Sequence, residues 1–327
     1  MSTILAVDIG GTKTLFGLFE NNGKLRHKMR FESQTYETFE AVLSAFLETF
    51  TDETPISSAC IAIAGPVNGQ YGKVTKLPWQ IDAELISHLF SIEHVRLCND
   101  FEAVGYGIST LRTDELLTLQ EGKPLTTSPR VVLGAGTGLG QALLIPSDDD
   151  WQVIATEGGH VDFAPQNATQ LLLLEHLIQR HGHVSYDRIV CGSGLVSIYN
   201  FLRDYKQLEE NTELRLMMVK GDAAAAISQF AQQGDSLSKQ ALDMFISIYA
   251  AQAGNLALTC LARGGVYLAG GIILKNLSQF QQGEFIHHFQ NKGRMSELMA
   301  DMPIHIVLNE ELGLNGARLL AEKAMYN

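Results

Sequence analysis

Near its N-terminus the chain reads Ile4-Leu5-Ala6-Val7-Asp8-Ile9-Gly10-Gly11-Thr12-Lys13-Thr14. The apolar run before Gly10 predicts a strand that is buried on both faces. The turn after it has no bulky side chain at Gly10 or Gly11, so its backbone N–H groups can approach an anion closely. Asp8 is expected beside that turn, where it would repel a phosphate unless a metal lay between them. The stretch therefore suggests a Mg²⁺-nucleotide site, and an ordinary Asp-Gly hairpin is the alternative.

The same combination of buried strand and glycine turn recurs twice further along the chain. The apolar residues 131–133 lead into Gly134-Ala135-Gly136-Thr137-Gly138-Leu139-Gly140, and the buried run 265–269 ends in Gly270-Gly271. A glycine repeat alone is weak evidence for phosphate binding. Its recurrence directly after a second buried strand strengthens the phosphate-loop interpretation of the first two turns.

Length and composition restrict the classes of protein that need to be considered. A chain of 327 residues is longer than one hydrophobic core usually supports, which predicts two domains. A formal charge of −12 argues against nucleic acid or an anionic membrane as a partner. There is no secretion signal and no apolar run of membrane-spanning length, so a cytoplasmic protein is expected. The cysteines lack zinc-ligand and redox spacing, and are expected to be buried thiols: Cys60, Cys98, Cys191 and Cys260.

Polar residues follow two further predicted strands. Asn99 and Asp100 come directly after the strand 94–98, at the sheet edge where α/β proteins bind ligands. Asp100 is expected to precede a helix over 102–111, so an N-cap role is the alternative, and both roles can hold.

Glu157 and His160 follow the predicted strand 151–156 and flank two glycines, so both side chains can reach one small polar ligand. Metal ligation is a competing interpretation, although two ligands are few for a metal. A structural histidine that is satisfied by its surroundings is the other alternative.

These turns, in a chain of two α/β halves, resemble those of the sugar kinase/Hsp70/actin superfamily, and most closely the proteobacterial-type glucokinases. The resemblance runs from Val7 to Ala317. Its most specific blocks are Asn99-Asp100-Phe101-Glu102-Ala103, residues 134–140, and Glu157-Gly158-Gly159-His160-Val161-Asp162-Phe163-Ala164-Pro165. It implies a two-domain, ribonuclease H-like (actin-like ATPase) α/β fold. A deep cleft would separate a small domain, 1–110 plus about 311–327, from a large domain, 111–310.

The resemblance also implies an activity, the transfer of the γ-phosphoryl group of Mg-ATP to the 6-hydroxyl of D-glucose. Asp100 would be the general base, and Asp8 would orient Mg²⁺ through water. The sugar-binding residues would be Asn99, Asp100, Glu157, His160 and Asp187. The residues that bind ATP would be Asp8, Gly10, Gly11, Thr12, Lys13, Gly136, Thr137, Gly138, Gly270 and Gly271. Many relatives are dimers, so a homodimer is expected.

The chain departs from the family pattern at two positions. Asp187 stands where Glu is usual, so its hydrogen bond to the sugar is expected to be longer or water-mediated. Thr75-Lys76 stands where Thr-Asn is common, which adds a cation on the small domain. A kinase for another hexose or an amino sugar is the nearest alternative function, and a non-catalytic sugar sensor of the same fold is an alternative from a different class.

Overall fold

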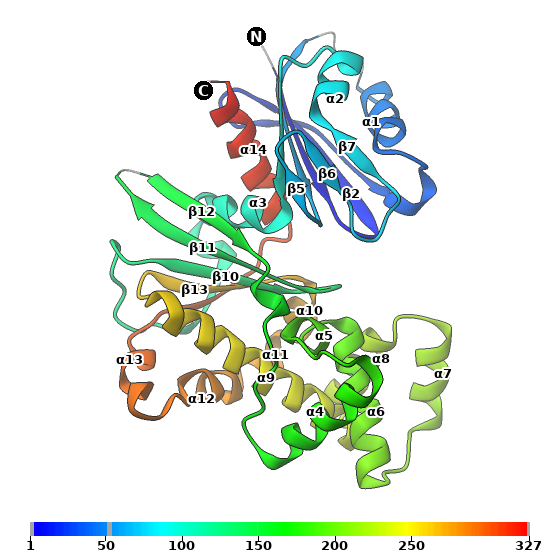
Figure 1. Cartoon of the computed structure of the whole chain (residues 1–327), viewed down its shortest axis with the longest axis vertical. Helices are drawn as coiled ribbons and strands as arrows, with labels where there is room; N and C mark the ends of the chain where they lie inside the picture. Colours follow the sequence, from blue (N-terminus) through cyan, green and yellow to red (C-terminus); the bar gives the residue numbers. More distant parts are fainter. Residues whose placement is uncertain (1–2, 51–53, 149, 326–327) are drawn as a thin grey trace. The chain divides into compact units, whose positions relative to one another are not determined.

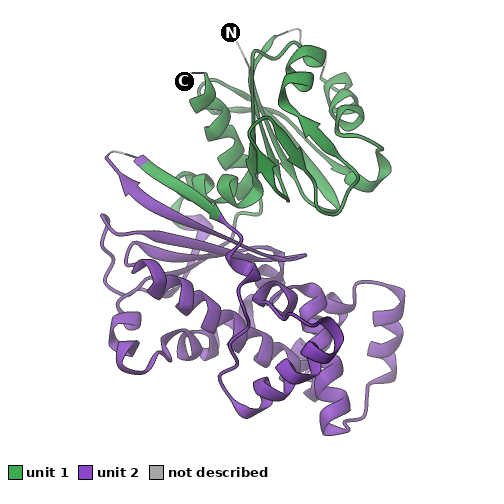
Figure 2. Cartoon of the chain, viewed as in Figure 1, with its two compact units in different colours: residues 1–113, 151–155, 309–327 green, residues 114–150, 156–308 purple. Residues whose placement is uncertain are grey.

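The computed structural model describes residues 3–50, 54–148 and 150–325, and the chain divides into two compact units (Figures 1 and 2). The first unit comprises residues 1–113, 151–155 and 309–327, and the second comprises 114–150 and 156–308. The predicted division assigned 151–155 to the larger domain. Within the described part of the chain, every helix is too short or too polar to cross a membrane.

The first unit is built on a five-stranded mixed sheet with the order β3-β2-β1-β4-β8. The strands are β1 (Thr3–Ile9), β2 (Lys13–Glu20), β3 (Leu25–Glu32), β4 (Ile56–Ile63) and β8 (His94–Asn99). The first three are antiparallel neighbours, whereas β1, β4 and β8 run parallel. Asn22-Gly23 lies in the hairpin turn between β2 and β3, and Gly23 has a φ of +81° that favours glycine. A small antiparallel sheet follows β4: β5 (Val67–Asn68), β6 (Tyr71–Lys73) and β7 (Gln80–Asp82).

Strand β1 is buried on both faces, as its apolar run predicted. Its odd-numbered residues Leu5 and Val7 join the core that α1 and α2 cover, and its even-numbered residues Ile4 and Ala6 join the core under α14. The covering helices are α1 (Phe39–Glu48), α2 (Ala83–Phe90), α3 (Asp100–Gly107) and α14 (Leu312–Ala324). Asp8 shares the parity of Ala6, so its side chain is directed to the α14 face.

The second unit contains a six-stranded sheet with the order β12-β11-β10-β13-β14-β9. The strands are β9 (Leu116–Gln120), β10 (Arg130–Ala135), β11 (Leu139–Ser147), β12 (Asp150–Thr156), β13 (Gly265–Ala269) and β14 (Ile304–Val307). Apart from β9, this order repeats that of the first sheet, with an antiparallel β10–β11 pair and parallel β13 and β14. The stretch 112–129 is polar and rich in Thr, yet it contains β9, which pairs with β14 at the sheet edge.

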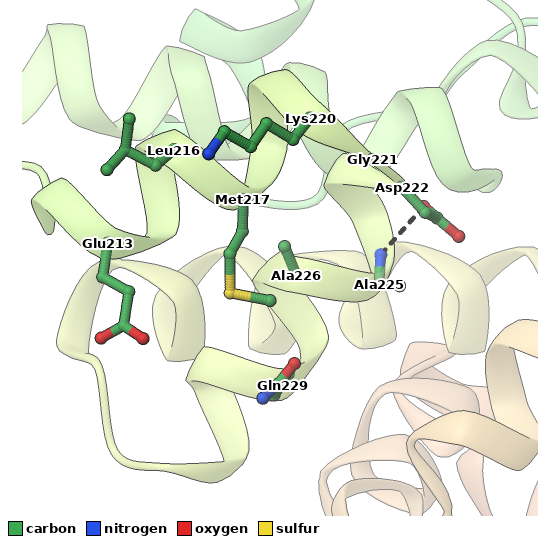
Figure 3. Close-up of a pocket in the computed structure, with 9 residues that line it drawn as sticks. All are labelled: Glu213, Leu216, Met217, Lys220, Gly221, Asp222, Ala225, Ala226 and Gln229. Atoms are coloured by element: carbon green, nitrogen blue, oxygen red, sulfur yellow. Dashed lines mark hydrogen bonds between the residues drawn. The ribbon is translucent and has the colours of Figure 1, made fainter.

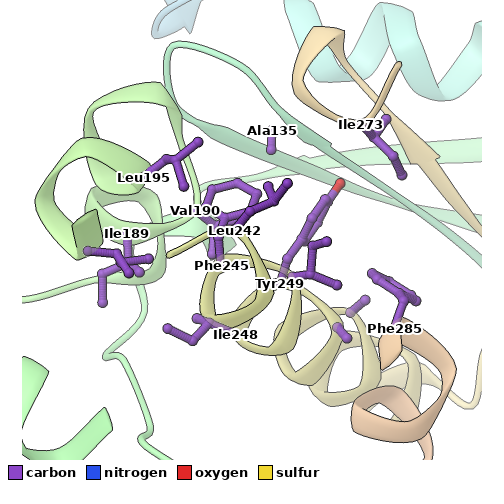
Figure 4. Close-up of a cluster of buried hydrophobic side chains, with 14 of the residues drawn as sticks. Ala135, Ile189, Val190, Leu195, Leu242, Phe245, Ile248, Tyr249, Ile273 and Phe285 are labelled. Atoms are coloured by element: carbon purple, nitrogen blue, oxygen red, sulfur yellow. The ribbon is translucent and has the colours of Figure 1, made fainter. Parts of the chain in front are cut away.

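A long buried helix, α9 (Ser236–Cys260), forms the centre of the second core, and its surface is apolar nearly all round (Figure 4). Its Tyr249 hydroxyl donates a 3.2 Å hydrogen bond to the carbonyl of Leu133 on β10, and its ring meets the edges of Phe280 and Phe285. The other helices are α4 (Ala168–His181), α5 (Tyr186–Ile189), α6 (Gly192–Lys206), α7 (Thr212–Lys220), α8 (Ala223–Gln232), α10 (Gly271–Lys275), α11 (Leu277–Phe280), α12 (Glu284–Gln290) and α13 (Ser296–Ala300).

Helices α3 and α14 approach so closely that a side chain would not fit between them. A Cβ atom added at Gly316 would lie 1.7 Å from the carbonyl oxygen of Ala103, and one at Gly107 would lie 2.3 Å from that of Leu312. Both obstacles are backbone atoms, so relief requires the helices to move apart.

We therefore expect Gly316→Ala to lower the free energy of unfolding by more than about 2 kcal/mol, because overpacking against backbone costs roughly 1–3 kcal/mol or more. Urea unfolding of the purified protein measures this. Gly221→Ala is the control, since a Cβ there meets nothing closer than 3.8 Å. Equal stability of the two variants would contradict the close approach.

Candidate active site

Backbone hydrogen bonds close the first glycine turn, between β1 and β2, and connect it to Ser33. The N–H of Gly10 donates to the carbonyl of Lys13 at 2.9 Å, and the N–H of Ser33 donates to the carbonyl of Thr12 at 2.8 Å. The Ser33 and Thr14 hydroxyls are 2.9 Å apart and hydrogen-bonded. Among the described residues, none accepts a hydrogen bond from the N–H groups of Gly11 and Thr12. The turn therefore presents two backbone donors that an anion can bind.

Asp8 lies at the end of β1 with its carboxylate against the start of α14. A Cβ added at Gly313 would lie 2.7 Å from the Asp8 Oδ2 atom, so only glycine leaves room for this side chain. Burial raises the pKa of Asp8 to about 6 from an ordinary value of 3.8. No cluster of three or more metal-ligating side chains occurs in residues 3–50, 54–148 and 150–325. A cation at Asp8 would therefore need most of its ligands from water or from a bound anion.

Asn99 and Asp100 lie at the same edge of the first sheet as Asp8. The register aligns Ile9 with Ile63, and Ile63 with Asn99, across three parallel strands. Neighbouring strands are about 4.8 Å apart, which puts the ends of β1 and β8 roughly 10 Å apart. The polar residues after both strands therefore share one edge of the sheet.

The alternative role of Asp100 as the helix cap was wrong. Asn99 is the N-cap of α3, and its Oδ1 accepts the N–H of Phe101 at 2.9 Å. Its Nδ2 donates to the carbonyl of Gly65 at 3.3 Å, so the amide also joins the ends of β8 and β4. Asp100 is the first residue of α3, which starts before the predicted Glu102, and its Oδ1 lies 3.0 Å from the same Phe101 N–H.

The second glycine turn, between β10 and β11, is built in a similar way. The N–H of Gly136 donates to the carbonyl of Gly138 at 2.9 Å, and the carbonyl of Gly136 accepts the N–H of Gly192 at 3.0 Å. Asp187 fixes the exit of the turn, because its Oδ1 accepts the N–H of Leu139 at 2.7 Å. The N–H groups of Thr137 and Gly138 donate to no other residue in the described ranges.

The segment 157–160 packs directly on this turn. A Cβ added at Gly159 would lie 2.1 Å from the carbonyl oxygen of Leu139, which explains why a glycine is needed there. His160 Nδ1 lies 3.7 Å from Glu157 Oε2, and His160 Nε2 lies 4.0 Å from Asp187 Oδ2. The structure thus brings Glu157, His160 and Asp187 together as one polar cluster of the second unit.

Tyr186 supports this cluster from within the core. Its hydroxyl accepts the N–H of Ala164 at 3.4 Å and the side-chain amide of Asn255 at 3.1 Å. Its own N–H donates to the carbonyl of Val161 at 3.2 Å. Neither Tyr186 nor Ser33 was singled out from the sequence. For Tyr186 the available signal was its position beside Asp187, whereas no sequence pattern marked Ser33.

The third glycine turn connects β13 to α10. Gly270 has a φ of +97°, and a Cβ added there would lie 2.6 Å from the carbonyl oxygen of Ala135 at the end of β10.

An ion pair of 3.7 Å joins Lys275 of α10 to Asp222. Asp222 is on the rim of a groove of about 430 Å³ between α7 and α8 (Figure 3). The groove is lined by Glu213, Leu216, Met217, Lys220, Gly221, Asp222, Ala225, Ala226 and Gln229.

We expect Asp8→Asn to stabilise the protein at high pH. With a pKa raised from 3.8 to about 6, the buried carboxyl opposes folding once it ionises. That penalty is absent below pH 4 and complete above pH 6, where it reaches up to about 3 kcal/mol at 1.4 kcal/mol per pKa unit. The measurement is the free energy of unfolding in urea at pH 4 and pH 8. Asp82→Asn, outside the site, is the control. A gain that does not grow with pH would contradict the burial of Asp8.

Together these features define the class of protein to which this chain belongs. A strand order that occurs twice, with a glycine turn after β1 and after β10, the matching strand of the second sheet, and a third turn after β13, is typical of the actin-like ATPase superfamily. The carboxylates beside the turns, together with a cluster of hydrogen-bonding side chains, are the groups that a kinase acting on a polyhydroxylated substrate requires. The protein is an ATP-dependent sugar kinase of this superfamily.

The comparisons with known proteins give the family. The protein-family model described as glucokinase matches residues 5–324 of this chain. The chain belongs to the bacterial glucokinase family of the proteobacterial and cyanobacterial type, and it phosphorylates glucose to glucose 6-phosphate using ATP. The glucokinase of Nostoc sp. is 42% identical over 99% of this chain and 100% of the relative, and that of Photorhabdus laumondii is 35% identical over 96% and 95%. The crystal structure of a glucokinase from an Antarctic psychrotroph has a TM-score of 0.83 at 28% identity, covering 99% of both chains.

Proposed function

We propose that Asp100 is the general base of the glucokinase reaction. Its carboxylate would accept the proton of the glucose 6-hydroxyl as that oxygen attacks the γ-phosphorus of ATP. The bond from the γ-phosphorus to the β,γ-bridging oxygen then breaks, and ADP leaves. The observation that carries the proposal is the register across β1, β4 and β8, because it assigns Asp100 to the same sheet edge as the first glycine turn. Asp100 is also the first residue of α3, so that helix fixes the position of its backbone.

We propose that Glu157, His160, Asp187 and Asn99 hold the sugar hydroxyl groups. The first three form a cluster with separations of 3.7 and 4.0 Å, so one small polyhydroxylated ligand can contact all of them. Asp187 Oδ1 already accepts a hydrogen bond from the N–H of Leu139, so Oδ2 is the oxygen that would bind a sugar hydroxyl. Carboxylates and amides in fixed positions discriminate strongly, because a sugar lacking one hydroxyl leaves a polar group unpaired.

Both glycine turns would bind the phosphates of ATP, the first formed by Gly10, Gly11, Thr12 and Lys13, and the second by Gly136, Thr137 and Gly138. The available backbone donors are the N–H groups of Gly11 and Thr12 in the first turn, and of Thr137 and Gly138 in the second. Gly270 and Gly271 would border the adenosine, and the groove between α7 and α8 is a suitable hollow on the same unit. Mg²⁺ would neutralise phosphate charge when it is bound. Asp8 fits such an ion, since its buried carboxylate gains a compensating charge and Mg²⁺ usually keeps several waters of its own.

The test is phosphate transfer from Mg-ATP to D-glucose by the purified chain, with Asp100→Asn as the variant. We expect kcat to fall by roughly 10²–10⁴-fold, the usual contribution of a general base. Glucose binding, measured by calorimetry, should be retained because the amide keeps most hydrogen bonds. Asp82→Asn is the matched control, since Asn caps α2 as well as Asp does. Full activity in Asp100→Asn would refute the assigned role.

The same assay measures selectivity for the sugar, with mannose, galactose, fructose and N-acetylglucosamine as competing acceptors. Phosphorylation of N-acetylglucosamine or galactose as efficient as that of glucose would show that Asp187, in place of the usual Glu, has widened the site.

We also propose that the enzyme acts as a homodimer in the cytoplasm. The dimer rests on the family resemblance, and the location rests on the sequence. We expect light scattering of the purified chain to give twice the monomer mass of 35.9 kDa. A mass near 35.9 kDa at micromolar concentration would refute the dimer.

A further inference from the structure

Lys76 lies over the first glycine turn. A Cβ atom added at Gly11 would be 3.2 Å from Lys76 Cδ and 3.3 Å from Lys76 Cβ. The aliphatic part of the lysine therefore covers the backbone whose N–H groups are available to an anion. The ammonium group extends from a stem that is already in contact with the turn, and the residue is exposed to solvent.

The backbone that carries Lys76 is held firmly from both sides. The N–H of Thr75 donates to the carbonyl of Ala64 at 3.0 Å, directly after β4. On the other side, Leu77 and Trp79 are buried, and the indole N–H of Trp79 donates to the carbonyl of Tyr36 at 3.1 Å. Thus the segment 74–79 is part of the fold of the first unit, and the backbone of Lys76 is held beside Gly11.

The charges around the turn distinguish Lys76 from Lys13. Lys13, at the exit of the turn, pairs with Glu32 at 3.7 Å. Lys76 forms no ion pair with any carboxylate of the described ranges, although the chain as a whole carries a charge of −12. A lysine that has no carboxylate partner, and whose side chain lies against a turn with two unpaired backbone N–H donors, favours an anionic ligand.

We infer that the Lys76 ammonium binds a phosphate oxygen of the nucleoside triphosphate at the first glycine turn, and so is a further residue of the donor site. The inference rests on the proposed function. The backbone donors supply directional hydrogen bonds, and the lysine adds a mobile positive charge. Because phosphoryl transfer depends mainly on positioning and on charge neutralisation, this contact supports binding of the donor and orientation of its terminal phosphates.

The experiment compares wild type, Lys76→Met, Lys76→Arg and Lys24→Met. Lys24→Met also removes one positive charge from the first unit, but at the β2–β3 turn, at the opposite end of β2 from Gly11. For Lys76→Met we expect the KM for Mg-ATP to rise roughly ten-fold or more, as the loss of a charge-assisted hydrogen bond implies. The KM for glucose should change less than two-fold. Lys76→Arg should recover most of the loss, and Lys24→Met should match wild type.

Binding is measured separately, with inorganic tripolyphosphate as the probe in calorimetric titrations at low and high salt. Lys76→Met should weaken this binding by a similar factor, and the difference from wild type should shrink as salt increases, because the ammonium is exposed. This readout does not require turnover. If tripolyphosphate binding depends on Lys76 while no sugar is phosphorylated, the proposed catalytic roles fail and the anion site remains.

Two results would overturn the inference. One is a Lys76→Met variant with the same tripolyphosphate affinity and KM for Mg-ATP as Lys24→Met. The other is a rise in the KM for glucose with an unchanged donor KM, which would assign the ammonium to the sugar. A thermal melt of each variant accompanies the titrations, and a melting temperature equal to that of wild type excludes misfolding as the cause.

Discussion

The buried carboxylate of Asp8 is the constraint on which the first unit depends. Strand β1 is apolar on both faces, and its register with β2 and β4 fixes where the chain leaves the sheet. Placing an acid at that point opposes folding at neutral pH, because burial disfavours the charged form. The α14 helix accommodates the carboxylate only because Gly313 has no side chain. A structure that keeps an unfavourable charge at a strand end and clears space for it is well suited to receive a cation there.

The second unit repeats the strand arrangement of the first, but its glycine turn is held in place by different contacts. Its glycine turn is anchored by Asp187 and by the start of α6, and the cluster of Glu157 and His160 is packed on the same turn through Gly159. The core below is dense, with Tyr249 hydrogen-bonded to the central strand β10. The second glycine turn and the cluster of Glu157 and His160 are therefore parts of one supported substructure.

Much of this organisation could be predicted from local patterns. The buried strands expected before Gly10, Gly134 and Gly270 have strong short-range signals, and the structure confirms them as β1, β10 and β13. Strand β9 was missed because an edge strand lacks the continuous apolar run of a buried one. The cap of α3 was assigned to the wrong residue, since Asn99 and Asp100 are both good caps and only the backbone conformation decides between them. Ser33 and Tyr186 act through tertiary hydrogen bonds, which no local pattern encodes.

The contact between Gly159 and the Leu139 carbonyl also restricts how such an enzyme can evolve. A larger residue at position 159 would push against the backbone that leaves the second glycine turn, and so would disturb the proposed phosphate turn as well as the proposed sugar-binding cluster. New substrate preferences are therefore accessible mainly through exchange of exposed side chains, such as Glu157 and His160, on an unchanged backbone. Variation at Asp187 is coupled to the turn itself, and divergence there is expected to be slower and conservative.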